Sequence, residues 1–182
     1  MPNNMTNIVR ISGLDSAVDK IRSFYLINEE ETGGALDFEK ILPIPADVAQ
    51  DESKAREWCR CHWGDARNSY WGRIVQEPTE QAPELVIRFT TAWNEPDGIF
   101  EALVNQVQGL SFSAFCIDED SPTATVFRLN DDDGHTEADI QEAWITADEI
   151  EIDYTSERFI AVYREFFGVD PVDPRAEEQM AA

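Results

Sequence analysis

Hydrophobic residues recur along the chain with two periods, one near two residues and one near 3.6. Alternation within segments rich in β-branched and aromatic residues predicts β-strands. Strands are therefore expected over residues 7–12, 36–45, 84–91, 110–117, 123–129, 140–145 and 150–154. Because Pro43 and Pro45 close the second of these segments, it is expected at the edge of a sheet.

The helical period predicts four helices separated by these strands. They are expected over residues 15–26, 52–62, 94–109 and 159–167. In the third, Asn94 is the expected cap, Pro96 lies in the first turn, and Gly109 ends the helix. Residues of several elements are predicted to share one core, namely Val18, Ile21, Ile87, Phe89, Leu103 and Val107.

The order of the elements predicts an α+β fold, a ferredoxin-like sandwich with a mainly antiparallel sheet and helices on one face. With 182 residues, the chain is expected to form a single folded unit. We expect a ferredoxin-like part over residues 1–134, an acidic C-terminal extension packed on it over 135–168, and a flexible tail over 169–182.

Charge is distributed unevenly along the chain, whose formal net charge is −23. Residues 1–91 carry 15 acidic and 10 basic side chains, whereas residues 92–182 carry 22 and 4. The segment from Asp118 to Glu157 holds 14 acidic side chains and one basic one, Arg128. Because it also contains aromatic and β-branched residues, its charges are expected on a folded surface. Direct binding to a nucleic-acid backbone is not expected, since phosphates require cationic partners.

Carboxylates within this acidic segment form the predicted partner-binding surface. Glu149, Glu151 and Asp153 alternate with apolar residues, so a strand would place them on one face about 6.6–6.8 Å apart. That spacing is similar to the separation of phosphates along a nucleic-acid strand. Two acidic turns are expected to extend the surface. The predicted partner-binding residues are Asp118, Glu119, Asp120, Asp131, Asp132, Asp133, Glu149, Glu151 and Asp153.

Four short segments resemble the YubB ferredoxin-like domain family of phages and conjugative plasmids. They are Asn7 to Gly13 after an N-terminal M-P-N, Phe38 to Pro45, Trp63-Gly64, and Thr90 to Trp93 followed by Pro96. The resemblance covers residues 1–134 and departs from the family pattern at residues 65–68. It implies a ferredoxin-like fold without an iron–sulfur cluster and a setting on mobile elements, which often encode inhibitors of host defence. It implies no catalytic residues.

The sequence gives only weak signals for metal binding and catalysis. Cys59, Cys61 and His62 lack the paired spacing of a zinc site, and neither zinc nor a disulfide is expected. Residues 131–142 resemble a calcium loop, but Thr136 stands where glycine is required. No catalytic motif is present, so the protein is not expected to be an enzyme or to need a cofactor. A group of aromatic residues is expected to pack mainly in the core: Trp58, Trp63, Tyr70, Trp71 and Trp93.

These observations predict a non-enzymatic, acidic binding protein of a mobile element. It would act as a DNA mimic that inhibits a bacterial defence complex, such as a CRISPR effector or a restriction enzyme, by occupying its basic channel. The alternatives are an accessory or structural protein whose acidity serves solubility, and a weak divalent-cation-binding module. Three cysteines, no signal sequence and no long apolar run favour the bacterial cytoplasm. The oligomeric state stays open.

Overall fold

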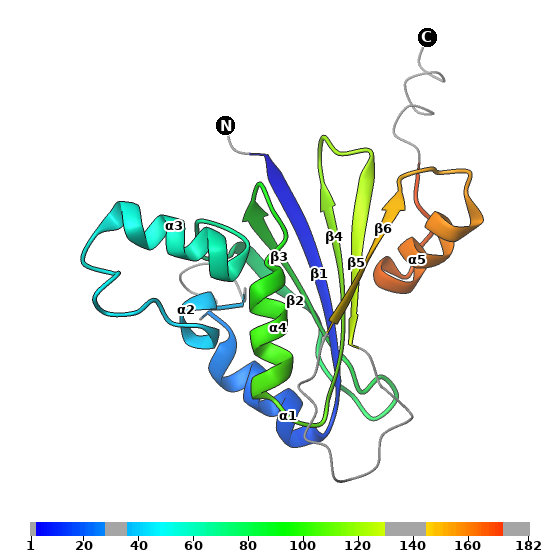
Figure 1. The fold of residues 1–182 in the computed structure, drawn as a ribbon. Helices are drawn as coiled ribbons and strands as arrows, with labels where there is room; N and C mark the ends of the chain where they lie inside the picture. Colours follow the sequence, from blue (N-terminus) through cyan, green and yellow to red (C-terminus); the bar gives the residue numbers. More distant parts are fainter. Residues whose placement is uncertain (1–2, 28–35, 130–144, 173–182) are drawn as a thin grey trace, which may run out of the picture.

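The computed structural model describes residues 3–27, 36–129 and 145–172 (Figure 1). The strands are β1 (Asn4–Gly13), β2 (Tyr70–Gln76), β3 (Leu85–Ala92), β4 (Leu110–Asp118), β5 (Thr123–Leu129) and β6 (Ile145–Glu151). The helices are α1 (Asp15–Lys20), its π-helical continuation η1 (Ile21–Tyr25), α2 (Phe38–Ile41), α3 (Glu52–Trp63), α4 (Asp97–Gln106) and α5 (Glu157–Phe167). The fold is therefore α+β, as predicted.

The strands form one antiparallel sheet in the order β2-β3-β1-β4-β5-β6. β1 lies inside the sheet, paired with β3 on one side and β4 on the other. Asn7, for example, is opposite Phe89 of β3 and Cys116 of β4. This register brings residues separated by more than 100 positions in the sequence onto one row across the sheet.

The main core lies between one sheet face and helices α1 to α4. Alternate strand residues such as Val9, Ile87 and Phe89 point to this face, because successive side chains of a strand point to opposite sides. The six residues predicted to share a core all belong to this buried cluster: Val18, Ile21, Ile87, Phe89, Leu103 and Val107. That prediction is confirmed.

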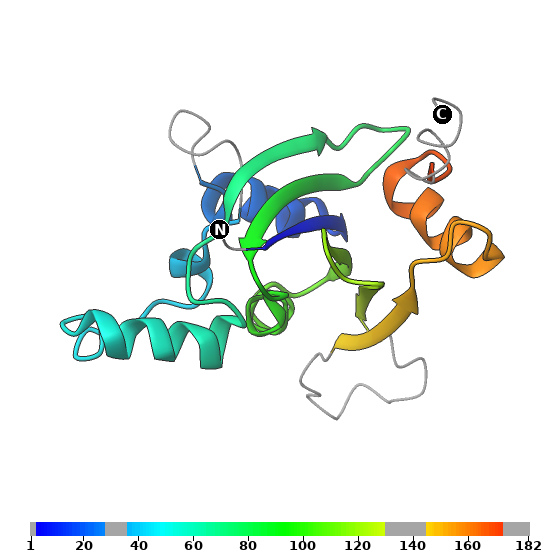
Figure 2. The ribbon, with the colours of Figure 1, turned by 90° about the horizontal axis from the view of Figure 1, so that it is seen from above.

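The opposite sheet face is covered by α5, so the helices do not all lie on one face as expected. Figure 2 shows α3 and α4 on one side of the sheet and α5 on the other. Ile8, Phe115 and Val126 form a second buried cluster with Phe159 and Phe166 of α5. The physical reason is that these three strand residues would otherwise expose a contiguous apolar patch to water.

The expected edge strand over residues 36–45 is wrong, because this segment contains the short helix α2. Phe38 and Ile41, three residues apart, are both buried against the core. The Oδ1 atom of Asn68 accepts a hydrogen bond from the N–H of Phe38 at 2.9 Å. The outer position beside β3 is taken instead by β2, a strand that the sequence pattern did not predict.

Two smaller differences concern element ends. Pro96, not Asn94, occupies the N-cap position of α4 and makes no side-chain cap; the carbonyl of Asn94 accepts a hydrogen bond from the Thr91 hydroxyl. β6 pairs with β5 and ends at Glu151, so the strand expected over 150–154 lies earlier in the chain. Residues 140–144, the turn expected at 130–134 and the tail from 173 lie outside the described residues.

Candidate functional site: an acidic edge and an arginine-lined pocket

Glu149 and Glu151 lie on the sheet face that carries α4. Ile150, between them, is buried against α5 on the opposite face, so alternation directs both exposed carboxylates away from α5. Their partners across β5 are Thr125 and Thr123. The predicted strand display of these two carboxylates is therefore present at the outer strand of the described sheet.

The turn from Asp118 to Asp120 lies at the same end of the sheet, because Thr123 and Glu151 pair directly beside the start of β5. Asp118 Oδ1 accepts hydrogen bonds from the Asp120 N–H at 2.8 Å and from Asn3 Nδ2 at 3.4 Å. Glu119 Oε1 accepts one from the Asn4 N–H at 3.2 Å. These contacts tie the turn to the N-terminal end of β1.

Asp153 is not part of the row of carboxylates on β6. The strand ends at Glu151, and Asp153 Oδ1 accepts hydrogen bonds from the N–H and the hydroxyl of Thr155, at 2.8 and 2.7 Å. Its carboxylate therefore orders the turn before α5, and the prediction of three carboxylates on one strand face is wrong at this position. Asp131, Asp132 and Asp133 lie outside the described residues. We call the remaining residues the acidic edge: Asp118, Glu119, Asp120, Glu149 and Glu151.

Acidic side chains on the α5 side of the sheet differ from the acidic edge in their pairing. Glu165 accepts two hydrogen bonds from Arg128, at 2.7 and 2.9 Å, and Asp148 pairs with Arg158 at 2.5 Å. In the described parts of the chain, no ion pair involves a residue of the acidic edge. Among the described residues, the carboxylates of this edge are therefore not paired with a protein cation.

A cavity of about 490 Å³ continues the acidic edge towards α3 and α4. Glu95 and Asp97 line it together with Ala147 of β6, and Glu95 Oε1 accepts a hydrogen bond from the Thr125 hydroxyl at 2.7 Å. Burial raises the pKa of the Cys116 thiol, and the carboxylates of Glu95 and Asp97 raise it further. Cys116 therefore stays a neutral thiol rather than a reactive thiolate.

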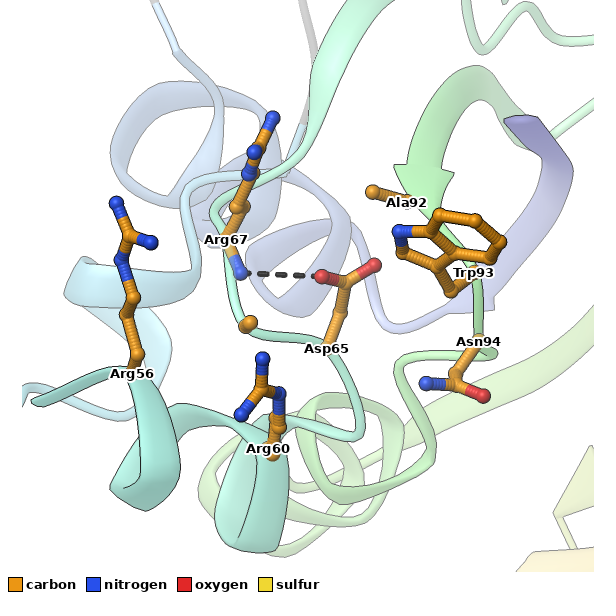
Figure 3. Close-up of a pocket in the computed structure, with 8 residues that line it drawn as sticks. Arg56, Arg60, Asp65, Arg67, Ala92, Trp93 and Asn94 are labelled. Carbon is orange, nitrogen blue, oxygen red and sulfur yellow. Dashed lines mark hydrogen bonds between the residues drawn. The ribbon is translucent and has the colours of Figure 1, made fainter. Parts of the chain in front are cut away.

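A second cavity, of about 260 Å³, contrasts with the acidic edge because arginines line it. We call it the arginine pocket; its polar and aromatic lining residues are Arg56, Arg60, Asp65, Arg67, Trp93 and Asn94. Figure 3 shows that α3, the loop after it, and the segment after β3 supply them. Arg60 and Asn94 line both cavities. The arginine pocket therefore adjoins the cavity of about 490 Å³ that continues the acidic edge.

The close approach of α3 and α4 holds the walls of the arginine pocket together. Gly64 ends α3 with a φ of 89°, a conformation that favours glycine. A side chain there would overlap the carbonyl oxygen of Glu95, and one at Gly98 would overlap the carbonyl oxygen of His62. Glycine at both positions therefore allows the end of α3 to contact the start of α4.

Asp65 is the buried acidic residue of the arginine pocket, with only 1% of its surface exposed. Its Oδ1 atom accepts a hydrogen bond from the Arg67 N–H at 3.1 Å, whereas Oδ2 has no hydrogen-bond partner among the described residues. Burial raises the pKa of Asp65, and the backbone N–H dipoles of Arg67, Ala92 and Ala66 offset part of this effect. The pocket thus contains an under-satisfied carboxyl group beside cationic side chains.

Trp93 borders the pocket with an unusual backbone and an exposed ring. Its φ is 80°, a conformation that costs a non-glycine residue about 1–3 kcal/mol. Its N–H donates to the Asn3 carbonyl at 3.1 Å, which helps to hold that conformation, and the residue is 56% exposed. Trp71, with a φ of 49°, is 71% exposed. The expectation that the aromatic group packs mainly in the core is confirmed for Trp63 and wrong for Trp71 and Trp93.

The Cys-Arg-Cys-His segment lies near the end of α3, and its two cysteines differ in burial. Cys59 is buried and Cys61 exposed on α3, and the His62 ring stacks on Trp58 with centroids 4.3 Å apart. Among the described residues, no group of three or more histidine, cysteine or acidic side chains is arranged to hold a metal ion. His135 and the whole calcium-loop segment, residues 131–142, lie outside the described residues.

The arginine pocket was missed by the sequence analysis, although one signal was present. Arg56 and Arg60 are four residues apart on α3 and therefore share a helix face. Trp63-Gly64 and Thr90 to Trp93, two segments that carry the family resemblance, both adjoin the pocket. Only the fold brings Asp65 beside Trp93, 28 positions later in the chain.

Comparisons with protein-family models, curated proteins and solved structures find no match to this chain. Within the described residues, no helix is both long and apolar enough to cross a membrane.

Proposed function

We propose that this chain is a non-enzymatic binding protein whose acidic edge occupies the basic nucleic-acid channel of a bacterial defence complex. The observation that carries the proposal is the row of unpaired carboxylates on β6. Glu149 and Glu151 project from one face of an ordered strand, and no ion pair within the described residues involves either of them. Such groups are available to lysine and arginine side chains of a partner.

Geometry supports mimicry of a nucleic-acid strand better than it supports a role in solubility alone. Alternate residues of a strand lie about 6.6–6.8 Å apart, and hydrogen bonds to β5 hold the β6 backbone that carries these carboxylates. Charged side chains that serve solubility alone need neither an ordered backbone nor alignment along a strand. The −23 charge of the chain adds long-range steering towards a basic partner.

We further propose membership of the YubB ferredoxin-like family and a cytoplasmic location in a bacterial host. The elements β1, α1, β2, β3, α4 and β4 follow one another along the chain, with η1, α2 and α3 between α1 and β2. Together with the strand arrangement β2-β3-β1-β4 in the sheet, this order supports a ferredoxin-like arrangement. β6 and α5 would then form the extension, adding one strand beyond β5 and covering the second face.

The test measures DNA binding by a purified CRISPR effector complex and, separately, by a restriction enzyme, each with increasing amounts of this protein. The expected result is loss of DNA binding by one of them in proportion to occupancy, weakened by salt because the contacts are solvent-accessible. The variant Asp120→Lys, Glu149→Lys, Glu151→Lys should bind the partner at least tenfold less tightly.

The matched control reverses charge at the opposite end of the sheet, at Asp15, Asp19 and Glu80, which are exposed. Ten-residue β1 separates the two ends by roughly 30 Å, about three screening lengths at physiological salt. The control should inhibit as the original protein does. Inhibition by the acidic-edge variant equal to that of the original would contradict mimicry and leave solubility as the role of the charge. Loss of inhibition on removal of calcium would favour a cation-binding module.

A further inference from the structure

We propose that the arginine pocket binds a mononucleotide, with the base between Trp93 and Asp65 and the phosphate against Arg56, Arg60 and Arg67. This site goes beyond the acidic edge and uses the opposite charge. The argument rests on the combination of cations, a buried acceptor and an aromatic ring in one cavity.

The arginines create a local positive region in a strongly acidic chain. Residues 54–73 contain five basic and two acidic side chains. Arg56 contacts Glu52 at 2.7 Å and Arg60 contacts Glu57 at 3.4 Å, but each guanidinium has five N–H donors and one carboxylate uses only some of them. Exposed pairs of this kind contribute about 0–1 kcal/mol, so a phosphate can recruit the remaining donors.

The Asp65 carboxyl indicates that the uncharged part of the ligand must carry a hydrogen-bond donor. A buried acceptor without a donor costs about 1–3 kcal/mol, and Oδ2 of Asp65 has no hydrogen-bond partner in the described part of the chain. A fully ionised inorganic anion cannot supply that donor, and hydrogen phosphate offers only a single O–H, whereas a nucleobase offers N–H groups on its pairing edge. Guanine offers adjacent N1–H and N2–H donors, so it fits this carboxyl better than adenine.

Trp93 supplies a surface for the base. The residue is 56% exposed, and it borders the same cavity as Asp65 (Figure 3). Stacking of a base on an aromatic side chain contributes about 1–3 kcal/mol. The strained backbone of Trp93, with a φ of 80°, is the kind of conformation that clusters at ligand sites.

Size and charge favour a mononucleotide over a nucleic-acid strand. The cavity measures about 260 Å³, just below the usual range of small-molecule sites, about 300–1,000 Å³. The −23 charge of the chain repels every phosphate of a polymer, while a single phosphate beside the arginines lies within one screening length of them.

Isothermal titration of the full chain with GMP, AMP, guanosine and inorganic phosphate tests the proposal. GMP should bind most tightly, and guanosine and phosphate at least tenfold more weakly. Arg60→Gln should weaken GMP at least tenfold while leaving guanosine unchanged, and Asp65→Asn should remove the preference for GMP over AMP. Trp93→Leu should weaken both GMP and guanosine.

Arg73→Gln is the matched control, because Arg73 lies in the same basic segment and does not line the pocket. It should bind GMP like the original protein. Circular dichroism identifies any variant that fails to fold. If Asp65→Asn fails to fold, Arg60→Gln and Trp93→Leu decide the result, because both substitutions are at exposed positions. Absence of GMP binding at millimolar concentration, or GMP affinity unaffected by Arg60→Gln, would overturn the proposal. Tighter binding of a single-stranded oligonucleotide than of GMP would overturn the restriction to a mononucleotide.

Discussion

Asp65 and Glu149 are carboxylates in opposite surroundings, one buried in a pocket and the other exposed to solvent. Asp65 is 1% exposed and its Oδ1 accepts the Arg67 N–H, whereas Glu149 projects from β6 into solvent. Burial penalises the charged form of Asp65 and raises its pKa. An exposed carboxylate instead keeps its hydration and can exchange it for a partner's cations.

The raised pKa of Asp65 predicts a pH-dependent contribution to stability. Between the ordinary aspartate pKa of the unfolded chain and the raised pKa of the folded protein, the folded state binds more protons. The free energy of unfolding contributed by Asp65 therefore falls as pH rises through that window and is constant above it. Asp65→Asn lacks this ionisation, so its stability relative to the original protein should increase with pH across the same window.

Urea denaturation of both proteins at a series of pH values from 3 to 8 measures this difference. Comparison of the two proteins removes the contributions of the other carboxyl groups. A difference that is independent of pH, or that decreases as pH rises, would contradict the burial of an ionisable Asp65.

At the scale of elements, α4 and α5 are comparable helices packed on opposite faces of the sheet. Leu103 of α4 and Phe159 of α5 are 0% and 1% exposed. They belong to two separate buried clusters. The second face therefore contributes a core of its own, and α5 is part of the packed fold.

Truncation of either residue should destabilise the protein substantially. We expect Leu103→Ala to lower the free energy of unfolding by about 2–5 kcal/mol and Phe159→Ala by about 3–5 kcal/mol. The control is Glu101→Ala, at an exposed position of α4, which should change it by less than about 0.5 kcal/mol. Chemical denaturation measures all three. A loss near zero for Phe159→Ala would show that α5 does not pack on the sheet.

At the scale of the molecule, charge pairing differs between the two sides of the sheet. On the α5 side, Arg128 forms an ion pair with Glu165. The carboxylates of the acidic edge have no paired cation among the described residues, so they repel one another. Such repulsion lowers the stability of the folded state and is screened by salt. The same feature makes the edge available to a partner.

Neutralisation of the acidic edge should therefore stabilise the protein. Glu149→Gln with Glu151→Gln should raise the melting temperature at low salt, and this gain should shrink as sodium chloride increases. The control Glu165→Gln removes the negative charge and one of the two oxygens that accept hydrogen bonds from Arg128, and it should change stability by about 0–1 kcal/mol in the opposite direction. Differential scanning calorimetry measures both. A lower melting temperature for the edge variant would show that Glu149 and Glu151 make stabilising contacts.

The sequence by itself determined the elements whose signals are local. The faces of β3, the core residues of α4, the helix at residues 159–167 and the α+β class followed from periods of two and 3.6 residues. Glu149 and Glu151 were placed on one strand face for the same reason, whereas Asp153 was misplaced because nothing local marked the end of β6 at Glu151.

Only the tertiary structure decided the features that depend on contacts between distant residues. Residues 38–41 became helical because Phe38 and Ile41 pack together into the core, and β2 formed because β3 offered it an edge. α5 covers the second face because Ile8 and Phe115, far apart in sequence, leave an apolar surface there. The arginine pocket joins Asp65 to Trp93 through the contact of α3 with α4, and strand register and helix packing are not encoded in any single segment.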